Sequence, residues 1–119
     1  MARVVHRRDR NGDRILATDA AVADSLLGKA RGLMFRRTFP GDALVFPFDG
    51  DGVRTLHMLC VPFAIDAIWL REGRVEHVAR LSAWTGVDRA PADTVIELPA
   101  GAADGVGEGD AVRVETADP

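Results

Sequence analysis

The sequence predicts a mostly β protein of the α+β class: a compact antiparallel barrel or sandwich with one or two short helices. Three observations support this class. Short apolar runs alternate with turns that contain Gly, Asp and Pro, and only one segment has the spacing of a helix. The chain has 119 residues, of which 47% are hydrophobic and 28% charged, which suits one globular domain. We expect that domain to span residues 1–119, with Thr116 to Pro119 as a frayed tail.

The first two elements are predicted to form a hairpin. Arg3 to Arg7 and Arg14 to Thr18 flank Asn11-Gly12, a dipeptide that favours the positive φ angles of a tight turn. The next segment, Asp19 to Lys29, is rich in Ala and Leu and has apolar residues at helical spacing. We expect a helix there, with Asp19 as its N-cap and Gly32 near its end.

The middle of the chain is predicted to contain three strands. Ala43 to Phe48 and Val53 to Met58 are separated by Asp49-Gly50-Asp51-Gly52, which we interpret as a turn that ends the first strand. Ala64 to Leu70 is apolar on both faces except at Asp66, and this pattern is typical of a strand buried on both sides.

The last third is predicted to contain three more strands. Arg71-Glu72-Gly73-Arg74 should turn the chain back into Val75 to Leu81, which makes a second hairpin. Thr94 to Leu98 and Ala111 to Glu115 complete the set, with a short turn near Ala102 to Val106.

Composition restricts the compartment and the class of partner. One cysteine excludes an intramolecular disulfide, and no apolar run approaches the ~18 residues of a membrane span. The N-terminal residues lack the apolar stretch of a signal peptide, so we expect a cytoplasmic protein with no membrane partner. The 14 Arg against 1 Lys and 13 Asp against 5 Glu fit either a GC-rich genome or a salt-adapted, halophilic cytoplasm.

The net charge of −3 is the sum of +5 over residues 1–40 and −8 over residues 41–119. The basic part is split between two segments, so we do not expect a nucleic-acid partner. We expect the two parts to interleave in one fold.

The usual catalytic templates are absent from the sequence. No nucleophile elbow or Walker sequence is present, and Gly105 to Gly109 lacks dinucleotide spacing. Asp49-Gly50-Asp51-Gly52 resembles the start of a calcium loop, but its later ligands are missing. The three histidines are far apart in the sequence. Cys60 is interpreted as a buried thiol rather than a partner of His57. No metal or cofactor is predicted.

Two charged residues are candidates for a site. Asp66 lies where burial is nearly obligatory, so its carboxylate must bond backbone amides or an Arg such as Arg31, or act as an acid or base in a pocket. Arg31, at the expected helix end, could neutralise carbonyls or hold an anion. Met34, Met58 and Trp84 are core residues or the lining of a ligand groove.

Several blocks together resemble the DUF192 family of small bacterial and archaeal domains, in order from about Ile15 to Glu115. The blocks are Arg31-Gly32-Leu33-Met34-Phe35-Arg36, Leu56 to Asp66, Trp84, Val95-Ile96-Glu97-Leu98-Pro99-Ala100-Gly101, and Gly109-Asp110 with Val112. The resemblance implies a small, mostly β fold and no assigned activity. Many relatives carry Met-Lys-Asn in the second block, and here Leu59 and Cys60 replace the Lys and the Asn. Many are also exported, and this chain shows no export signal.

The blocks suggest a site in which charge, soft apolar surface and rings converge as one ligand pocket. Its candidate residues are Arg31, Met34, His57, Met58, Asp66 and Trp84.

Three functions remain open at this point. The first is a non-catalytic binding module for a small anionic or sugar-like ligand, or for a partner protein. The second is a hydrolase or lyase that uses Asp66 as acid or base, assisted by His57 or Arg31. The third is an interaction or structural domain without a pocket. A concave cleft lined by Arg and Asp favours the first two, and a flat apolar patch favours the third.

Overall fold

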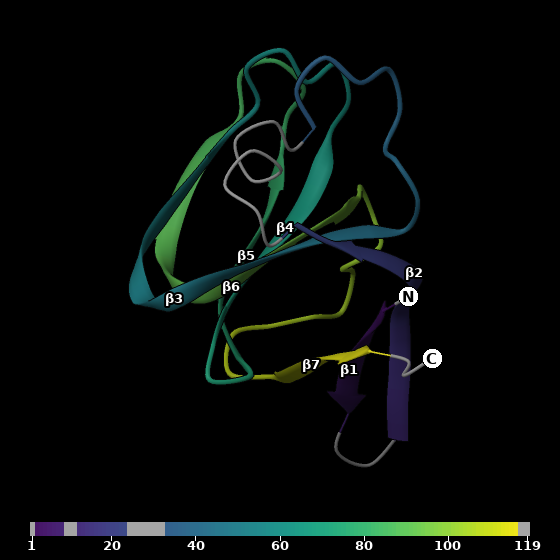
Figure 1. Cartoon of the computed structure of the whole chain (residues 1–119), viewed down its shortest axis with the longest axis vertical. Coiled ribbons are helices and arrows are strands. Elements are labelled where there is room, and N and C mark those ends of the chain that lie inside the picture. The colour runs from purple at the N-terminus through teal and green to yellow at the C-terminus, as the bar shows by residue number, and fades with distance from the viewer. Residues whose placement is uncertain (1, 9–11, 24–32, 117–119) are drawn as a thin grey trace.

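A computed structural model describes residues 2–8, 12–23 and 33–116. In these ranges the chain is all β, and its strands close into one ring in the order β1-β2-β3-β6-β4-β5-β7 (Figure 1). Neighbouring strands are antiparallel except β2 and β3. The strands are β1 (Ala2–Arg8), β2 (Gly12–Val22), β3 (Ala43–His57), β4 (Ile65–Arg71), β5 (Arg74–Leu81), β6 (Val87–Pro99) and β7 (Ala111–Thr116).

The described ranges contain no helix, so none there has the length and hydropathy that a membrane crossing requires.

The predicted N-terminal hairpin is confirmed, because β1 pairs antiparallel with β2 up to Arg8 opposite Gly12. The start of the predicted helix is wrong. Asp19 is not an N-cap, since β2 continues to Val22 and pairs in parallel with β3, with Ala20 opposite Ala43. The ladder of Ala20, Ala21 and Val22 with β3 overrides the helix propensity of alanine. Residues 24–29 of that prediction, and Gly32, lie outside the described residues.

The prediction of two strands between Ala43 and Met58 is also wrong. β3 runs unbroken from Ala43 to His57, and its pairing with β6 shifts register between Pro47 and Gly52. The Asp-Gly segment therefore forms an irregularity that bends a continuous strand rather than a turn that ends it. β6 follows the same bend, and it begins at Val87 instead of Thr94.

The second predicted hairpin is confirmed. Glu72 and Gly73 both have positive φ, 52° and 76°, as a two-residue hairpin turn between β4 and β5 requires. Residues Ile65 to Leu70 of β4 are all buried, as the apolar pattern predicts, because β5 and β6 pair with both edges of β4.

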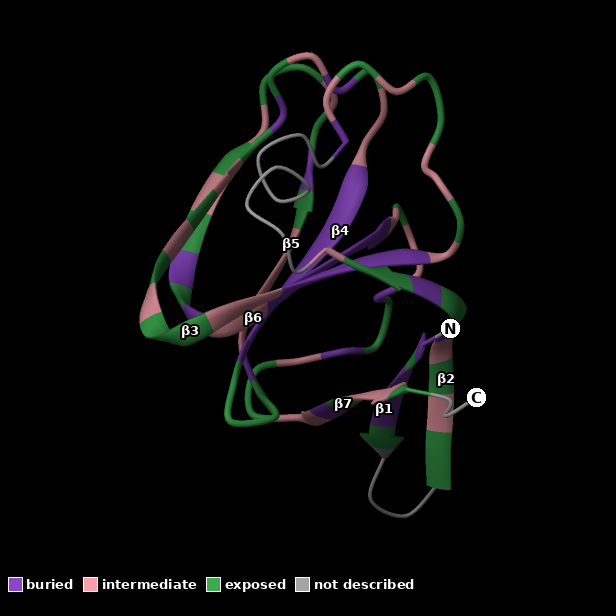
Figure 2. Cartoon of the chain, viewed as in Figure 1, coloured by how far each residue is buried: buried purple, intermediate pink, exposed green. Residues whose placement is uncertain are grey.

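Two apolar clusters cover opposite faces of the central sheet. Cluster 1 draws residues from all seven strands and includes Ile68 and Leu70 of β4, so it fills the ring. Cluster 2 includes Ile65, Ala67 and Trp69 of the same strand, which point to the other face because side chains alternate along a strand. Figure 2 shows this buried centre, with exposed residues on the loops at the upper end.

Candidate functional site

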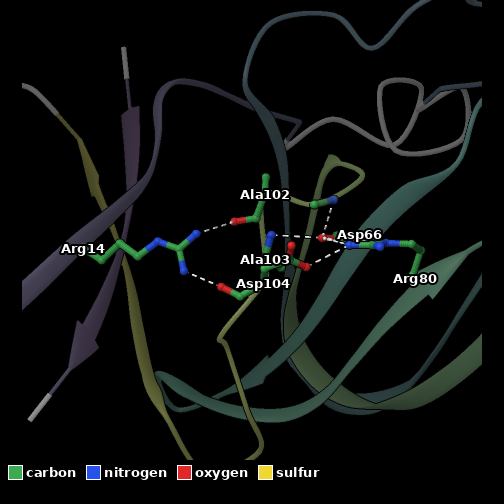
Figure 3. Close-up of polar contacts among 7 residues, drawn as sticks. Arg14, Asp66, Arg80, Ala102, Ala103 and Asp104 are labelled. Atoms are coloured by element: carbon green, nitrogen blue, oxygen red, sulfur yellow. Dashed lines mark hydrogen bonds and ion pairs between the residues drawn. The ribbon is translucent and has the colours of Figure 1, made fainter.

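Asp66 is buried on the cluster 1 side of β4 and holds the loop that follows β6. Its Oδ2 accepts hydrogen bonds from the backbone N–H groups of Gly101 and Ala103, both at 2.9 Å. The guanidinium of Arg80 completes the arrangement, with Nε 2.8 Å from Oδ1 (Figure 3). Asp66 raises the pKa of Arg80 above its ordinary range through this hydrogen bond and charge. Each carboxylate oxygen therefore already has donors.

The same loop is fixed from its other side. Arg80 Nη2 also bonds Asp104 Oδ1 at 2.9 Å, and Arg14 of β2 donates to the carbonyls of Ala102 and Asp104 (Figure 3). Backbone bonds within the loop form successive turns at the predicted position. This network joins β2, β4 and β5 to the loop that follows β6. Its hydrogen bonds fix the position of the loop backbone.

A second group of residues lies where three turns meet, at the upper end of the molecule in Figure 1. The central turn spans residues 58–61, with the N–H of Val61 donating to the carbonyl of Met58 at 3.0 Å. Its third residue, Cys60, has φ of 62°, at a position where such turns favour glycine. Leu59 occupies the corner and is 61% exposed.

The other two turns bond to the central turn, one on each side. The N–H of Phe35 donates to the carbonyl of Cys60 at 2.9 Å, and the N–H of Trp84 donates to the carbonyl of Val61 at 3.0 Å. Because Cys60 and Val61 follow Leu59 directly, Phe35 and Trp84 are each bonded to the backbone of the turn that carries Leu59. We call the surface formed by Phe35, Leu59 and Trp84 the three-turn face.

Both flanking aromatic residues have strained backbones. Phe35 has φ of 65° within a turn closed by Arg36 and Leu33, and Trp84 has φ of 67°. Thr85 donates to the carbonyl of Ala83, so Trp84 is the centre of a γ-turn with positive φ, the rarer and more strained form. Left-handed φ costs a non-glycine residue roughly 1–2 kcal/mol. Strain of this kind clusters at functional sites.

The strained turns hold large apolar side chains in solvent. Phe35 is 74% exposed and Trp84 is 60% exposed. Gly86 makes the third turn possible, because a Cβ there would come within 2.8 Å of the Ser82 backbone. The turns thus leave most of the surface of both aromatic residues exposed, although burial is the usual reason for an aromatic residue in a fold.

The structure divides the residues predicted from sequence. Met58, which precedes Leu59 in the chain, is buried in cluster 2, and Trp84 lies on the three-turn face. Met34 is half-buried in the first turn. The exposed His57 accepts a hydrogen bond through Nδ1 from the N–H of Leu59 at 3.2 Å, so it supports the central turn.

Asp66 is not brought together with these residues, because it points to the opposite face of the sheet from Met58. Arg31 lies outside the described residues. Phe35 and Leu59 were not predicted as site residues, although both are apolar residues within the family blocks. Cys60, expected to be buried, is half-buried in the turn.

Glu97 is a buried acid that was not predicted from the sequence either. It pairs with Leu44 of β3 and Ala67 of β4, both in cluster 2, so its side chain lies on that face. Among the described residues, none donates a hydrogen bond to its carboxyl. Burial raises the pKa of Glu97 to about 7. Its burial could have been predicted from the sequence, because Glu97 is the single acid in the apolar run Val95 to Leu98.

The three histidines do not converge in the described structure. His6 is buried and its Nε2 lies 2.9 Å from Asp110, while His77 lies 2.7 Å from Asp88 and against the ring of Trp69. The pairing with His77 lowers the pKa of Asp88. Within the described ranges, no three His, Cys, Asp or Glu side chains form a group that could hold a metal ion.

A crevice of about 280 Å³ lies beside β2. Its acidic group, Asp42, is already engaged by the hydroxyl and N–H of Thr18 and the N–H of Asp19, which lower the pKa of Asp42. The lining residues are Ile15, Leu16, Ala17, Thr18, Asp42, Pro99 and Ala102.

No curated protein matches this sequence. Two crystal structures share its fold with a TM-score of 0.74 each. One, from Sinorhizobium meliloti 1021, is described as a "putative transcription regulator"; it is 22% identical, and the match covers 96% of this chain and 94% of that one. The other, a protein of unknown function from Novosphingobium aromaticivorans DSM 12444, is 24% identical over 93% of this chain and 83% of that one. The model of an uncharacterised family, described as "Uncharacterized ACR", matches residues 7–114, and the chain therefore belongs to the DUF192 family.

Proposed function

We propose that this protein is a non-catalytic binding domain that recognises a partner protein through its three-turn face. The observation that carries the proposal is the exposure of Phe35, Leu59 and Trp84 on turns that are strained and bonded to one another. Exposed aromatic residues on a rigid support are typical of the residues that dominate protein interfaces.

The state of Asp66 supports binding over catalysis. A general acid or base needs a carboxyl oxygen that can reach a substrate, but both oxygens of Asp66 accept bonds from Arg80, and Oδ2 also from the loop backbone. The crevice beside β2 gives less support to the hypothesis that the protein binds a small ligand. The carboxylate of Asp42 in that crevice is already bonded to Thr18 and Asp19.

The proposal can be tested by affinity capture from an extract of the native cells with matched variants. Trp84→Ser and Phe35→Ser remove exposed rings, so both should leave the melting temperature nearly unchanged and lose the captured partner. Ile15→Ser is the control, since Ile15 is a 48% exposed apolar residue that lines the crevice far from the three turns.

Capture that survives both ring variants would refute the proposal. Loss of capture only with Ile15→Ser would assign binding to the crevice instead.

A further inference from the structure

The three-turn face differs from the rest of the surface in charge as well as in hydropathy. Its three turns lie in residues 33–40, 57–64 and 82–87, and all 18 Asp and Glu residues of the chain lie outside these segments. The segments include Arg37, which is exposed. In a protein with a net charge of −3, these three segments are thus rich in apolar residues and carry no carboxylate, and Asp88, which follows the third, is paired with His77.

A further exposed cation borders this end. Val87, 67% exposed, follows the third turn and pairs with His57, and Arg89 points to the same side of β6 two residues later. The arginines of the three segments and of their border are therefore few, namely Arg36, Arg37 and Arg89, and do not form a long basic tract. Trp and Arg are the residue types most enriched at the energetic centres of protein interfaces.

We propose that the three-turn face binds a short partner segment in which apolar side chains are flanked by Asp or Glu, a partner class that rests on the proposed function. Phe35, Leu59 and Trp84 contact the apolar side chains of the segment. Arg37 and Arg89 pair with its carboxylates. The positive charge at this end selects against basic segments, which repulsion would exclude.

The charge pattern favours a protein segment over a bilayer or a nucleic acid. Recognition of an anionic membrane surface typically uses clusters of 4–8 basic residues. Nucleic-acid binding likewise depends on several Lys or Arg contacts to phosphates. The few arginines here match the few carboxylates of a peptide, while the acidic remainder of the protein would repel a polyanion.

A random dodecapeptide library displayed on phage, selected on the intact protein, tests this inference. The expected result is enrichment of peptides with net negative charge and several Leu, Phe or Trp residues. Their affinity should fall about tenfold or more in Trp84→Ser and severalfold in Arg37→Glu, but not in Arg37→Lys or Ile15→Ser. Trp84→Gly, which also removes the strain at that residue, guards against a folding defect.

The other outcomes separate the two proposals. Enrichment of neutral or basic peptides that still require Trp84 would overturn the acidic class and leave the proposed function intact. Binding of phosphatidylglycerol vesicles or polyuridine without any enriched peptide would overturn both. If no peptide is enriched while Trp84-dependent capture of a cellular partner persists, the short-segment inference alone is wrong.

Discussion

At the scale of single residues, Glu97 makes a prediction about pH. Its folded pKa of about 7 lies above the ordinary value of 4.5, because burial disfavours the charged form. The protonated acid is therefore the form that the fold stabilises. This contribution is fully present below about pH 4.5 and is lost as the pH rises through about 7.

We expect Glu97→Gln to remove this pH dependence, because the amide stays neutral with nearly the same shape. Between pH 4.5 and about pH 8, the free energy of unfolding of the native protein should fall by about 3 kcal/mol relative to the variant. Urea denaturation across that range measures the difference. Glu108→Gln, at an exposed carboxyl, is the control, and parallel curves for native protein and Glu97→Gln would show that the buried acid carries no linkage.

At the scale of elements, local turn chemistry explains which strands could be predicted. The β4–β5 hairpin could be predicted from the turn at Glu72-Gly73, because the residues that pair across it are close together in the sequence. The bend in β3 and the early start of β6 could not be predicted, because each depends on the pairing of Gly52 to His57 with a strand far along the chain. The parallel pairing of β2 with β3, which keeps Asp19 in β2, could not be predicted either, because the two strands are also far apart in the sequence.

The site was predictable to a similar extent. A buried Asp66 must find donors, so its hydrogen-bonded state follows from the sequence, but the identity of Arg80 as its partner needs the β4–β5 register. The exposure of Phe35 depends on a bond to Cys60, 25 positions later, which no local pattern encodes.

The central turn of the three-turn face gives a prediction about strain. Cys60→Gly should raise the free energy of unfolding by about 0.5–1 kcal/mol, because glycine adopts positive φ freely and loses only part of this gain to the entropy of the unfolded chain. Cys60→Ala keeps the strain and removes the thiol, so it should match the native protein. Equal thermal stability of all three would show that the turn stores no strain.

At the scale of the whole molecule, the ring has one narrow seam. β5 and β7 share a single ladder pair, Arg74 opposite Ala111. Asp110 reinforces this seam from several directions: its carbonyl accepts the N–H of Val75 at 2.9 Å, and its Oδ2 accepts the N–H of Gly107 at 2.9 Å and lies 2.9 Å from His6 Nε2. These side-chain contacts hold the pKa of Asp110 below its ordinary value, first through Gly107 and then through His6.

We expect Asp110→Ala to open the ring at this seam before the rest of the sheet unfolds. Losing the carboxylate removes the bond to Gly107 and leaves both ring nitrogens of the buried His6 without a bond from the described residues, since none of these residues bonds His6 Nδ1. Hydrogen exchange should therefore accelerate in β7 and at Val75, while the β4–β6 ladder stays protected. Glu108→Ala in the same turn is the control and should leave exchange unchanged.

Because the pKa of Asp110 is lowered, the stability of the same seam should depend on pH. The ionised carboxylate is the form that the fold stabilises, so its contribution is present above the ordinary value of 3.8 and is lost as the pH falls through the lower folded pKa. Acid should thus weaken the β5–β7 seam, whereas Glu97 favours the fold at low pH. Exchange that rises uniformly over the sheet in acid, or in Asp110→Ala, would mean that the ring opens as one unit and not at this seam.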